Sequence, residues 1–298
     1  MKIVVTHSSP DMDAITSVWL LKKFLAGWET ASVKFVPAGE RLVNQRSASS
    51  SKKELNARRY TLDAIEKIGE DEIIHVDTGL GPLDHHQTSS DEVCAASLCH
   101  DFVKENIPEH RKEAVERMVK VIVDIDHFKE VFRKDPMADY HEFDVAGVLN
   151  GLKFQFPNQD HYYCEFTIKC LDAVLHEFEN RIWAEKEIAK NGKKFETRFG
   201  KGIGFETIND SVVKLSQKMG FAIALRKDPR KGYVRIKARP ESKIDLTLAY
   251  EKLRKIDPDA TWYLHVSKKM LLNGSAKNPK MRPTKLGVEE IIKILERI

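Results

Sequence analysis

The sequence has no apolar run long enough to cross a membrane and no pattern typical of a secretory signal. A spanning helix needs about 20 predominantly apolar residues, and no stretch of the 298 residues reaches that length. The N-terminus turns polar after "KIVV", so it lacks the longer apolar region of a signal peptide. We therefore expect a cytoplasmic protein with no membrane partner.

Cysteine is scarce, and its spacing excludes the common cysteine motifs. The chain has 4 cysteines, at Cys94, Cys99, Cys164 and Cys170. They form no CxxC pair and no zinc-finger spacing. In a cytoplasmic chain we expect reduced thiols that are mostly buried.

Charge of one sign is not in strong excess, so the bulk composition does not select a partner. The formal net charge of +4 permits an anionic substrate without requiring one. The hydrophobic share of 42% is ordinary for a globular chain that buries a sizeable core. Basic residues gather in Phe221–Arg239, which contains one acid, Asp228. This stretch is either a solvated strand face or a track for nucleic acid.

Apolar periodicity predicts strands that alternate with helices in the first half. Buried strands are expected at 2–7, 31–39 and 71–79, and helices at 13–26 and 91–106. Such alternation favours an α/β fold with a mostly parallel sheet and flanking helices.

The second half reads differently, as a smaller α+β C-terminal domain. Proline and glycine between 136 and 160 mark a linker, and 162–190 has the pattern of a long bridging helix. We therefore divide the chain into a catalytic domain at 1–135, a linker with its bridging helix at 136–190, and a C-terminal domain at 191–298. The turn in "LRKDPRKGYVRI" predicts a hairpin.

Aspartate and histidine cluster where the predicted strands end. They occur in "HSSPDMDAI", in "VDTG" followed by "LDHHQ", and in "VDIDHF", which reads as a helix or a third strand. The side chains are His7, Asp11, Asp13, Asp77, Asp84, His85, His86, Asp124 and Asp126. Ligands in open α/β sheets bind at the carboxyl ends of the strands, so these groups are expected to converge.

Crowded carboxylates repel one another unless cations separate them. Mixed carboxylate and imidazole ligands suit Mn²⁺, Fe²⁺, Co²⁺ or Zn²⁺. The number of ligands fits two metal ions about 3.5–4 Å apart better than one. The alternative for each residue is local: Asp11 or Asp13 caps a helix, Asp77 belongs to a turn, and His85 and His86 lie in an exposed loop.

The ordered set of motifs resembles the DHH phosphoesterase superfamily over about the first 130 residues. "HSSPDMDAI" resembles the first motif, "VDTG" the second, "DHH" the third, and the aspartate of "VDID" the fourth. "LDHHQ" and the C-terminal "WYLHVSKKMLLNGS" resemble the melanocyte-proliferating-gene branch of metal-dependent hydrolases, some of which are RNA exonucleases. The chain departs from that branch because its turn, Asn273-Gly274-Ser275, lacks the usual histidine.

The resemblance implies a role for each matched position. His7 and Asp11 would hold one divalent ion, and Asp13, His85 and Asp126 the other, with Asp124 as the alternative to Asp126. Asp77 would bridge the two ions. Asp84 would orient a neighbouring imidazole, and His86 would face the substrate phosphate. The ions are expected to be Mn²⁺, with Mg²⁺, Co²⁺ or Zn²⁺ as alternatives. His75 is expected to be a strand residue without a part in the chemistry.

In this superfamily the second domain closes over the metal centre and contacts the substrate in the cleft between the domains. The matching candidates are His265, Ser267, Lys268, Asn273, Gly274, Ser275 and Arg282. The sequence thus predicts an enzyme that hydrolyses phosphodiester bonds of nucleotides or short single-stranded nucleic acid by a two-metal mechanism. The alternatives are a small-molecule phosphatase or pyrophosphatase, and a nucleic-acid-binding module with a vestigial metal site. The oligomeric state is open, with a homodimer as one option.

Overall fold

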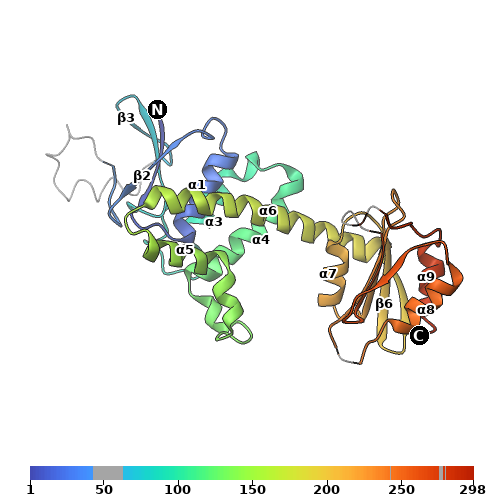
Figure 1. The fold of residues 1–298 in the computed structure, drawn as a ribbon. Helices are drawn as coiled ribbons and strands as arrows, with labels where there is room; N and C mark the ends of the chain where they lie inside the picture. Colours follow the sequence, from blue (N-terminus) through green and yellow to red (C-terminus); the bar gives the residue numbers. More distant parts are fainter. Residues whose placement is uncertain (43–62, 242, 275–277, 279) are drawn as a thin grey trace. The chain divides into compact units, whose positions relative to one another are not determined.

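The computed structural model describes residues 1–42, 63–241, 243–274, 278 and 280–298. The chain forms two compact units, Met1–Glu179 and Asn180–Ile298 (Figure 1). The polar, serine-rich stretch 40–59 has the composition of a loop or a weak helix, and most of it lies outside the described residues. Within the part of the chain that is described, no helix combines the length and apolar character needed to cross a bilayer.

A four-stranded sheet forms the centre of the first unit, in the order β2-β1-β4-β3. The strands are β1 (Lys2–His7), β2 (Ser32–Val36), β3 (Glu66–Ile68) and β4 (Asp71–His75). β1 pairs in parallel with β2 and β4, and β3 is antiparallel to β4. The predicted α/β class with a mostly parallel sheet is confirmed, and the β-branched runs of β1 and β4 are buried as central strands should be.

The helices of the first unit are α1 (Met12–Phe24), α3 (Ala95–Val103), α4 (Glu109–Asp126), α5 (Val145–Gln155) and the first part of α6 (Asp160–Asn191). Short 3₁₀ turns lie at η2 (Lys104–Asn106), η3 (Lys129–Phe132) and η4 (Asp139–Phe143). α1 packs against α3 and α4 and is buried nearly all round, because even Thr16 and Ser17 are fully buried. It is the central helix of this unit.

The third strand end that "VDIDHF" suggested is wrong, because α4 is one continuous helix to Asp126. Its buried side chains recur every three or four residues, at Ala114, Val115, Met118, Val119, Ile122 and Val123. The short "VKVIV" run also fits a strand, and such runs are ambiguous by periodicity alone. Residues two apart share a face in a strand, but a helix turns about 200° over two residues, so Asp124 and Asp126 do not share a face.

The segment expected to be a linker is partly helical. It contains η4 and α5, and it belongs to the first unit. Asp144 caps α5 by accepting a hydrogen bond from the Gly147 amide. The long helix expected at 162–190 is α6, and the boundary between the two units falls within it, between Glu179 and Asn180.

The second unit is built on a six-stranded sheet in the order β5-β6-β7-β8-β10-β9. Its strands are β5 (Lys193–Thr197), β6 (Gly200–Glu206), β7 (Ile223–Lys227), β8 (Val234–Ala238), β9 (Trp262–Leu264) and β10 (Met270–Asn273). The predicted hairpin is confirmed, since β7 and β8 pair antiparallel around a turn that Asp228 closes.

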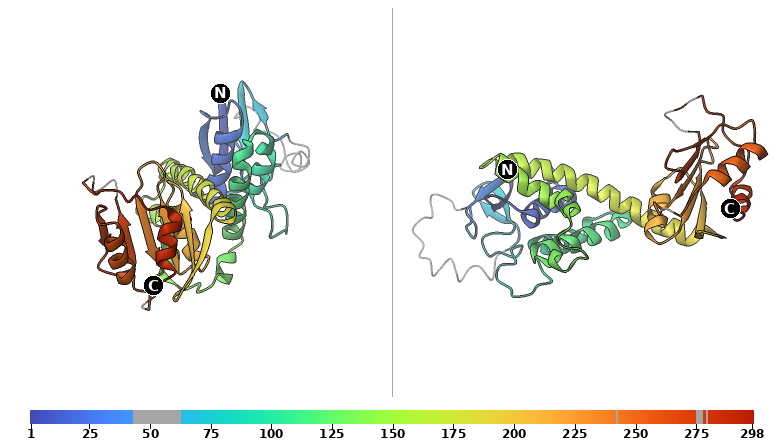
Figure 2. Two further views of the ribbon diagram at one scale, coloured as in Figure 1. Left: turned by 90° about the vertical axis from the view of Figure 1, so that its right-hand side faces the viewer. Right: turned by 60° about the horizontal axis from the view of Figure 1, so that its bottom comes forward.

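Alternate residues of β7 serve two cores on opposite faces of this sheet. Ile223 and Leu225 pack with α8 (Thr247–Ile256) and α9 (Val288–Leu295), while Ala224 packs with α7 (Ser211–Lys218) and the end of α6. Figure 2 shows α9 lying against the sheet. The α+β character expected of the second half is therefore present.

The four cysteines are free thiols, as expected. Cys94, Cys99 and Cys164 are buried, and Cys170 is half-buried. Burial raises the pKa of Cys164 to about 12, so this thiol is un-ionised at neutral pH.

Candidate metal centre

The first group of site residues lies where β1 ends and α1 begins. His7 is the last residue of β1, and Asp11 caps α1 by accepting a hydrogen bond of 3.0 Å from the Ala14 amide. His7 Nε2 lies 3.2 Å from Asp77 Oδ2 and 3.9 Å from Asp11 Oδ2. Asp11 therefore does cap the helix, as the local alternative held, but its second oxygen still faces the histidine.

The second group lies on a tight loop after β4. Asp77 adopts a left-handed conformation with φ of 53°, which aspartate tolerates better than most residues. Its amide donates to the Leu83 carbonyl at 3.1 Å, and Asp84 accepts from the Leu80 amide at 2.6 Å. The loop thereby returns on itself and brings His85 and His86 to the side of Asp77.

A clamp formed by Arg41, Glu66 and His75 supports this loop. Arg41 donates to the Gly79 carbonyl and pairs with Glu66. His75 accepts from the Leu42 amide at Nε2, and its Nδ1 faces Glu66 at 3.1 Å and Arg41 at 3.2 Å. No sequence pattern marked Arg41 or Glu66. His75 is buried at the end of β4, so it is a strand residue as expected, and it has a structural role here. That it takes no part in the chemistry stays a prediction.

His85 lies at the centre of three carboxylates. Its Nε2 is 3.5 Å from Asp77 Oδ1, 3.6 Å from Asp126 Oδ2 and 3.7 Å from Asp13 Oδ2. These separations exceed ordinary hydrogen-bond lengths. Ligands held about 2.1 Å from one ion lie roughly 3.0–3.4 Å apart at octahedral or tetrahedral angles. The spacing is therefore close to that of groups that share a metal ion.

Two buried carboxylate oxygens support a cation at this position. Among the described residues, Asp77 Oδ1 and Asp126 Oδ2 are buried without a hydrogen-bond partner. A buried carboxylate oxygen without a partner is costly, and the usual remedies are a donor or a metal ion. The residues present thus fit divalent ions, with His7, Asp11 and Asp77 as one candidate group and Asp77, His85 and His86 as another.

Carboxylates and imidazoles shift one another's pKa values at this centre. Burial and repulsion from Asp77 raise the pKa of Asp13 to about 8. Its closeness to the Asp77 carboxylate raises the pKa of His85 to about 9, although burial lowers it. Burial works to raise the pKa of Asp77, but the hydrogen bond from His7 and the nearby His85 ring lower it. The imidazoles thus supply positive charge that divalent ions would replace.

Asp13 has a second contact that the sequence did not reveal. Its two oxygens accept hydrogen bonds from the Ala95 and Ala96 amides, at 2.8 and 2.7 Å. These amides open α3, so a buried carboxylate here meets the favourable end of the helix dipole. Asp13 therefore joins α1, α3 and the metal centre.

The remaining residues divide between the expected and the missed. Asp84 Oδ1 lies 2.7 Å from His86 Nδ1, and His86 is exposed. His127 was missed, although it follows "VDID" directly. It groups with His85 and Asp126, while its Nε2 donates to the Val93 carbonyl at 2.9 Å.

The predicted substrate-binding residues of the second unit differ in burial and in hydrogen bonding. Asn273 is fully buried, donating to the Thr261 and Arg282 carbonyls and accepting from the Thr284 amide. His265 and Ser267 bond each other at 2.8 Å, and Lys268 pairs with Asp245. Arg282 is exposed, and Ser275 lies outside the described residues. Their contact with substrate stays a prediction, and for Asn273 the structure shows a role in holding the fold.

Gly274 lies at the edge of a basic cavity of about 200 Å³ in the second unit. Arg226, Lys231 and Arg235 line it together with Tyr233 and one acid, Asp228. Arg226 and Arg235 both pair with Asp210, so one carboxylate offsets two guanidinium groups. The cavity thus keeps a positive excess, which suits a phosphate.

Comparisons with known proteins give structural likeness alone. No family model and no curated sequence matches the chain. Among solved structures, the chain is similar to the DHH domain of a protein described as a member of a family of ribosomal proteins. The identity is 10% and the TM-score 0.32, and the match covers 99% of this chain and 86% of that one.

The chain is also similar to RecJ in complex with Mn²⁺ from Thermus thermophilus, at 10% identity and a TM-score of 0.27, covering 99% of this chain and 51% of that one. A third is a pGpG-specific phosphodiesterase from Vibrio cholerae, at 12% identity and a TM-score of 0.23, covering 93% of this chain and 94% of that one. Likeness this low carries no argument about activity, which rests on the residues themselves.

Proposed function

We propose that the chain is a metal-dependent phosphoesterase of the DHH type that cleaves phosphodiester bonds in nucleotides or short single-stranded nucleic acid. The observation that carries the proposal is the buried, unpartnered Oδ1 of Asp77, with the imidazoles of His85 and His86 at 3.5 and 3.6 Å. A binding module would have no use for a costly oxygen of this kind at the meeting point of two histidines and further carboxylates.

The distances support the two ligand sets that the motif resemblance implies. His7 and Asp11 would hold one divalent ion, and Asp13, His85 and Asp126 the other. Asp77 would serve both, because Oδ2 faces His7 and Oδ1 faces His85. When bound, such ions activate water and offset charge on a phosphate. Mn²⁺ suits this oxygen and nitrogen donor set.

The chain's own groups would bind and orient the phosphate. His86 is exposed, with a side-chain exposed fraction of 57%, so its ring is open to a ligand. Its Nδ1 meets Asp84, which leaves Nε2 to face a phosphate oxygen. Asp84 is itself held by the Leu80 amide and so fixes the ring in place.

The basic cavity of the second unit is the candidate for contact with the rest of the substrate. Its arginines and Tyr233 offer charge for a phosphate and a ring for stacking a base. A small-molecule phosphatase or pyrophosphatase is the second candidate, since the cavity volume of about 200 Å³ also suits a compact phosphate compound.

The test is a substrate panel run with Mn²⁺ and with chelator. It contains bis-p-nitrophenyl phosphate, pyrophosphate, dinucleotides, and labelled single-stranded RNA and DNA. We expect Mn²⁺-dependent release of nucleotide from dinucleotides or short strands. Hydrolysis of pyrophosphate alone would favour a small-molecule phosphatase or pyrophosphatase. If no compound were hydrolysed, the chain would be better explained as a binding module.

Two substitutions at Asp11 separate capping from metal binding. Asp11→Asn keeps an N-cap oxygen for the Ala14 amide but removes the charge that faces His7. We expect unchanged stability in urea and an affinity for Mn²⁺ at least about tenfold lower by calorimetry. Asp11→Ala should lose the affinity and also about 1 kcal/mol of stability. Equal Mn²⁺ affinity in wild type and Asp11→Asn would remove Asp11 from the ligand set.

A further inference from the structure

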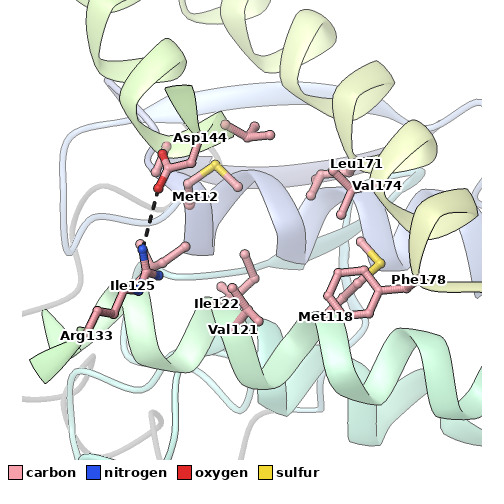
Figure 3. A pocket seen from close by; sticks show the side chains of 12 residues that line it. Met12, Met118, Val121, Ile122, Ile125, Arg133, Asp144, Leu171, Val174 and Phe178 are labelled. Carbon is pink, nitrogen blue, oxygen red and sulfur yellow. Dashed lines mark ion pairs between the residues drawn. The ribbon is translucent and has the colours of Figure 1, made fainter. Parts of the chain in front are cut away.

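An apolar cavity of about 220 Å³ lies within the first unit, apart from the charged groups of the metal centre. Figure 3 shows side chains of α4 on one wall, with Met118, Val121 and Ile122, and side chains of α6 on another, with Leu171, Val174 and Phe178. Met12 of α1 also lines it. Met118, Ile122 and Leu171 are almost fully buried, so the floor of the cavity is apolar and belongs to the core.

The charged side chains that line the cavity are already paired with each other. Arg133 and Asp144 lie 3.7 Å apart, as the dashed line in Figure 3 marks. A water molecule needs two to four polar partners, and aliphatic walls supply none. Val121 at the rim is exposed, so the cavity opens to solvent, and water at its apolar floor would lack polar partners. The two methionines add deformable walls that adapt to different shapes.

We propose that this cavity binds an uncharged, largely apolar small molecule of about the size of one or two fused aromatic rings. Its volume admits such a molecule, and its walls lack the polar partners that a hydrophilic one needs. A charged molecule would gain no unpaired counter-charge, because Arg133 and Asp144 neutralise each other. One hydrogen-bonding group on the molecule would reach this pair at the edge of the cavity.

The position of the cavity gives its occupant an influence on the metal centre. Met12 stands between Asp11 and Asp13 at the start of α1, and Ile125 precedes Asp126 at the end of α4. A ligand that packs against Met12 and Ile125 restrains the two helix ends that carry three candidate metal ligands. Occupancy and metal affinity are then coupled, and the coupling is reciprocal. This second step rests on the proposed function, whereas binding to the cavity does not.

The test uses the full chain and indole as a neutral probe, followed by saturation-transfer NMR. We expect transfer to indole at millimolar concentration, and binding at least about tenfold weaker for benzoate and benzylammonium. Val174→Phe fills the cavity and should abolish the transfer. Val148→Phe is the matched control, because Val148 is exposed on α5 and does not line the cavity. If circular dichroism shows that Val174→Phe does not fold, Ala146→Leu replaces it as the variant that fills the cavity.

Each of the following outcomes would contradict the proposal or one part of it. Absence of transfer, or equal transfer in both Phe variants, removes the site. A dimer in sedimentation that Val174→Phe dissolves would mean that the cavity receives a second copy of the chain instead. For the coupling, Mn²⁺ affinity should change several-fold in saturating indole. Indole binding with unchanged Mn²⁺ affinity overturns the coupling alone, and absence of Mn²⁺ binding overturns the proposed function but leaves the cavity standing.

Discussion

Asp77→Asn is expected to reduce Mn²⁺-dependent hydrolysis on the order of 10³-fold, the largest loss among single substitutions at the centre. Asp77 lies between two histidines: its Oδ2 is 3.2 Å from His7 Nε2, and its Oδ1 is 3.5 Å from His85 Nε2. Asparagine has nearly the same size but offers one neutral oxygen. It cannot place negative charge on both sides of the centre.

Stability should change little in this variant, because two effects oppose each other. A neutral side chain relieves the repulsion that, with burial, raises the pKa of Asp13 to about 8. It also weakens the pairing with His7 and His85 that lowers the pKa of Asp77. The control is Asp101→Asn, because the Asp101 side chain is exposed on α3, outside the loop that holds Asp77. Undiminished hydrolysis in Asp77→Asn with a normal urea midpoint would show that the proposed mechanism is wrong.

Gly274→Ala is expected to destabilise the second unit by about 2–4 kcal/mol. Gly274 has a left-handed φ of 80°, and an added Cβ would lie 2.1 Å from Tyr233 Cδ1. The ring would have to move, and it lines the basic cavity. The measurement is denaturant unfolding of the full chain, followed by intrinsic fluorescence.

Gly220→Ala provides the matched control in the same unit. Gly220 also has a positive φ, of 98°, but an added Cβ meets nothing within 4 Å. It should therefore show the backbone cost alone, about 1–2 kcal/mol. Combining Gly274→Ala with Tyr233→Ala should recover part of the loss. Equal losses at Gly274 and Gly220 would show that the contact with Tyr233 has no energetic weight.

The fold of the first unit could be predicted because its strands and α1 have unambiguous periods. β1, β4 and α1 match the ranges that apolar spacing indicates, with differences of a few residues at the ends. α4 could not be settled in the same way, since "VKVIVDI" fits both a helix and a strand. Its identity is decided by packing against α1 and α3, which no local pattern contains.

In the candidate site, too, some features could be predicted from the sequence and others could not. Paired aspartates and histidines stand out by their density, whereas the groups that fix their positions do not. Arg41 reaches Gly79 across 38 positions of sequence, and Asp13 reaches α3 across 82. His127 had a signal, its place directly after "VDID", but a lone histidine at a helix end is common without a ligand role. The motif around Asn273 predicted a substrate contact, which stays a prediction, but it gave no sign that this side chain is fully buried and holds the fold.

The two hydrogen bonds from Asp13 to α3 affect how related sequences should be judged. A chain that had lost its activity would still need an acceptor for the Ala95 and Ala96 amides, so selection for folding alone would keep this aspartate. His86 is exposed and bonds to Asp84, which the Leu80 amide already holds. Drift would therefore erase His86 early and Asp13 late. In a divergent relative, the survival of His86 is the better indication of a working enzyme.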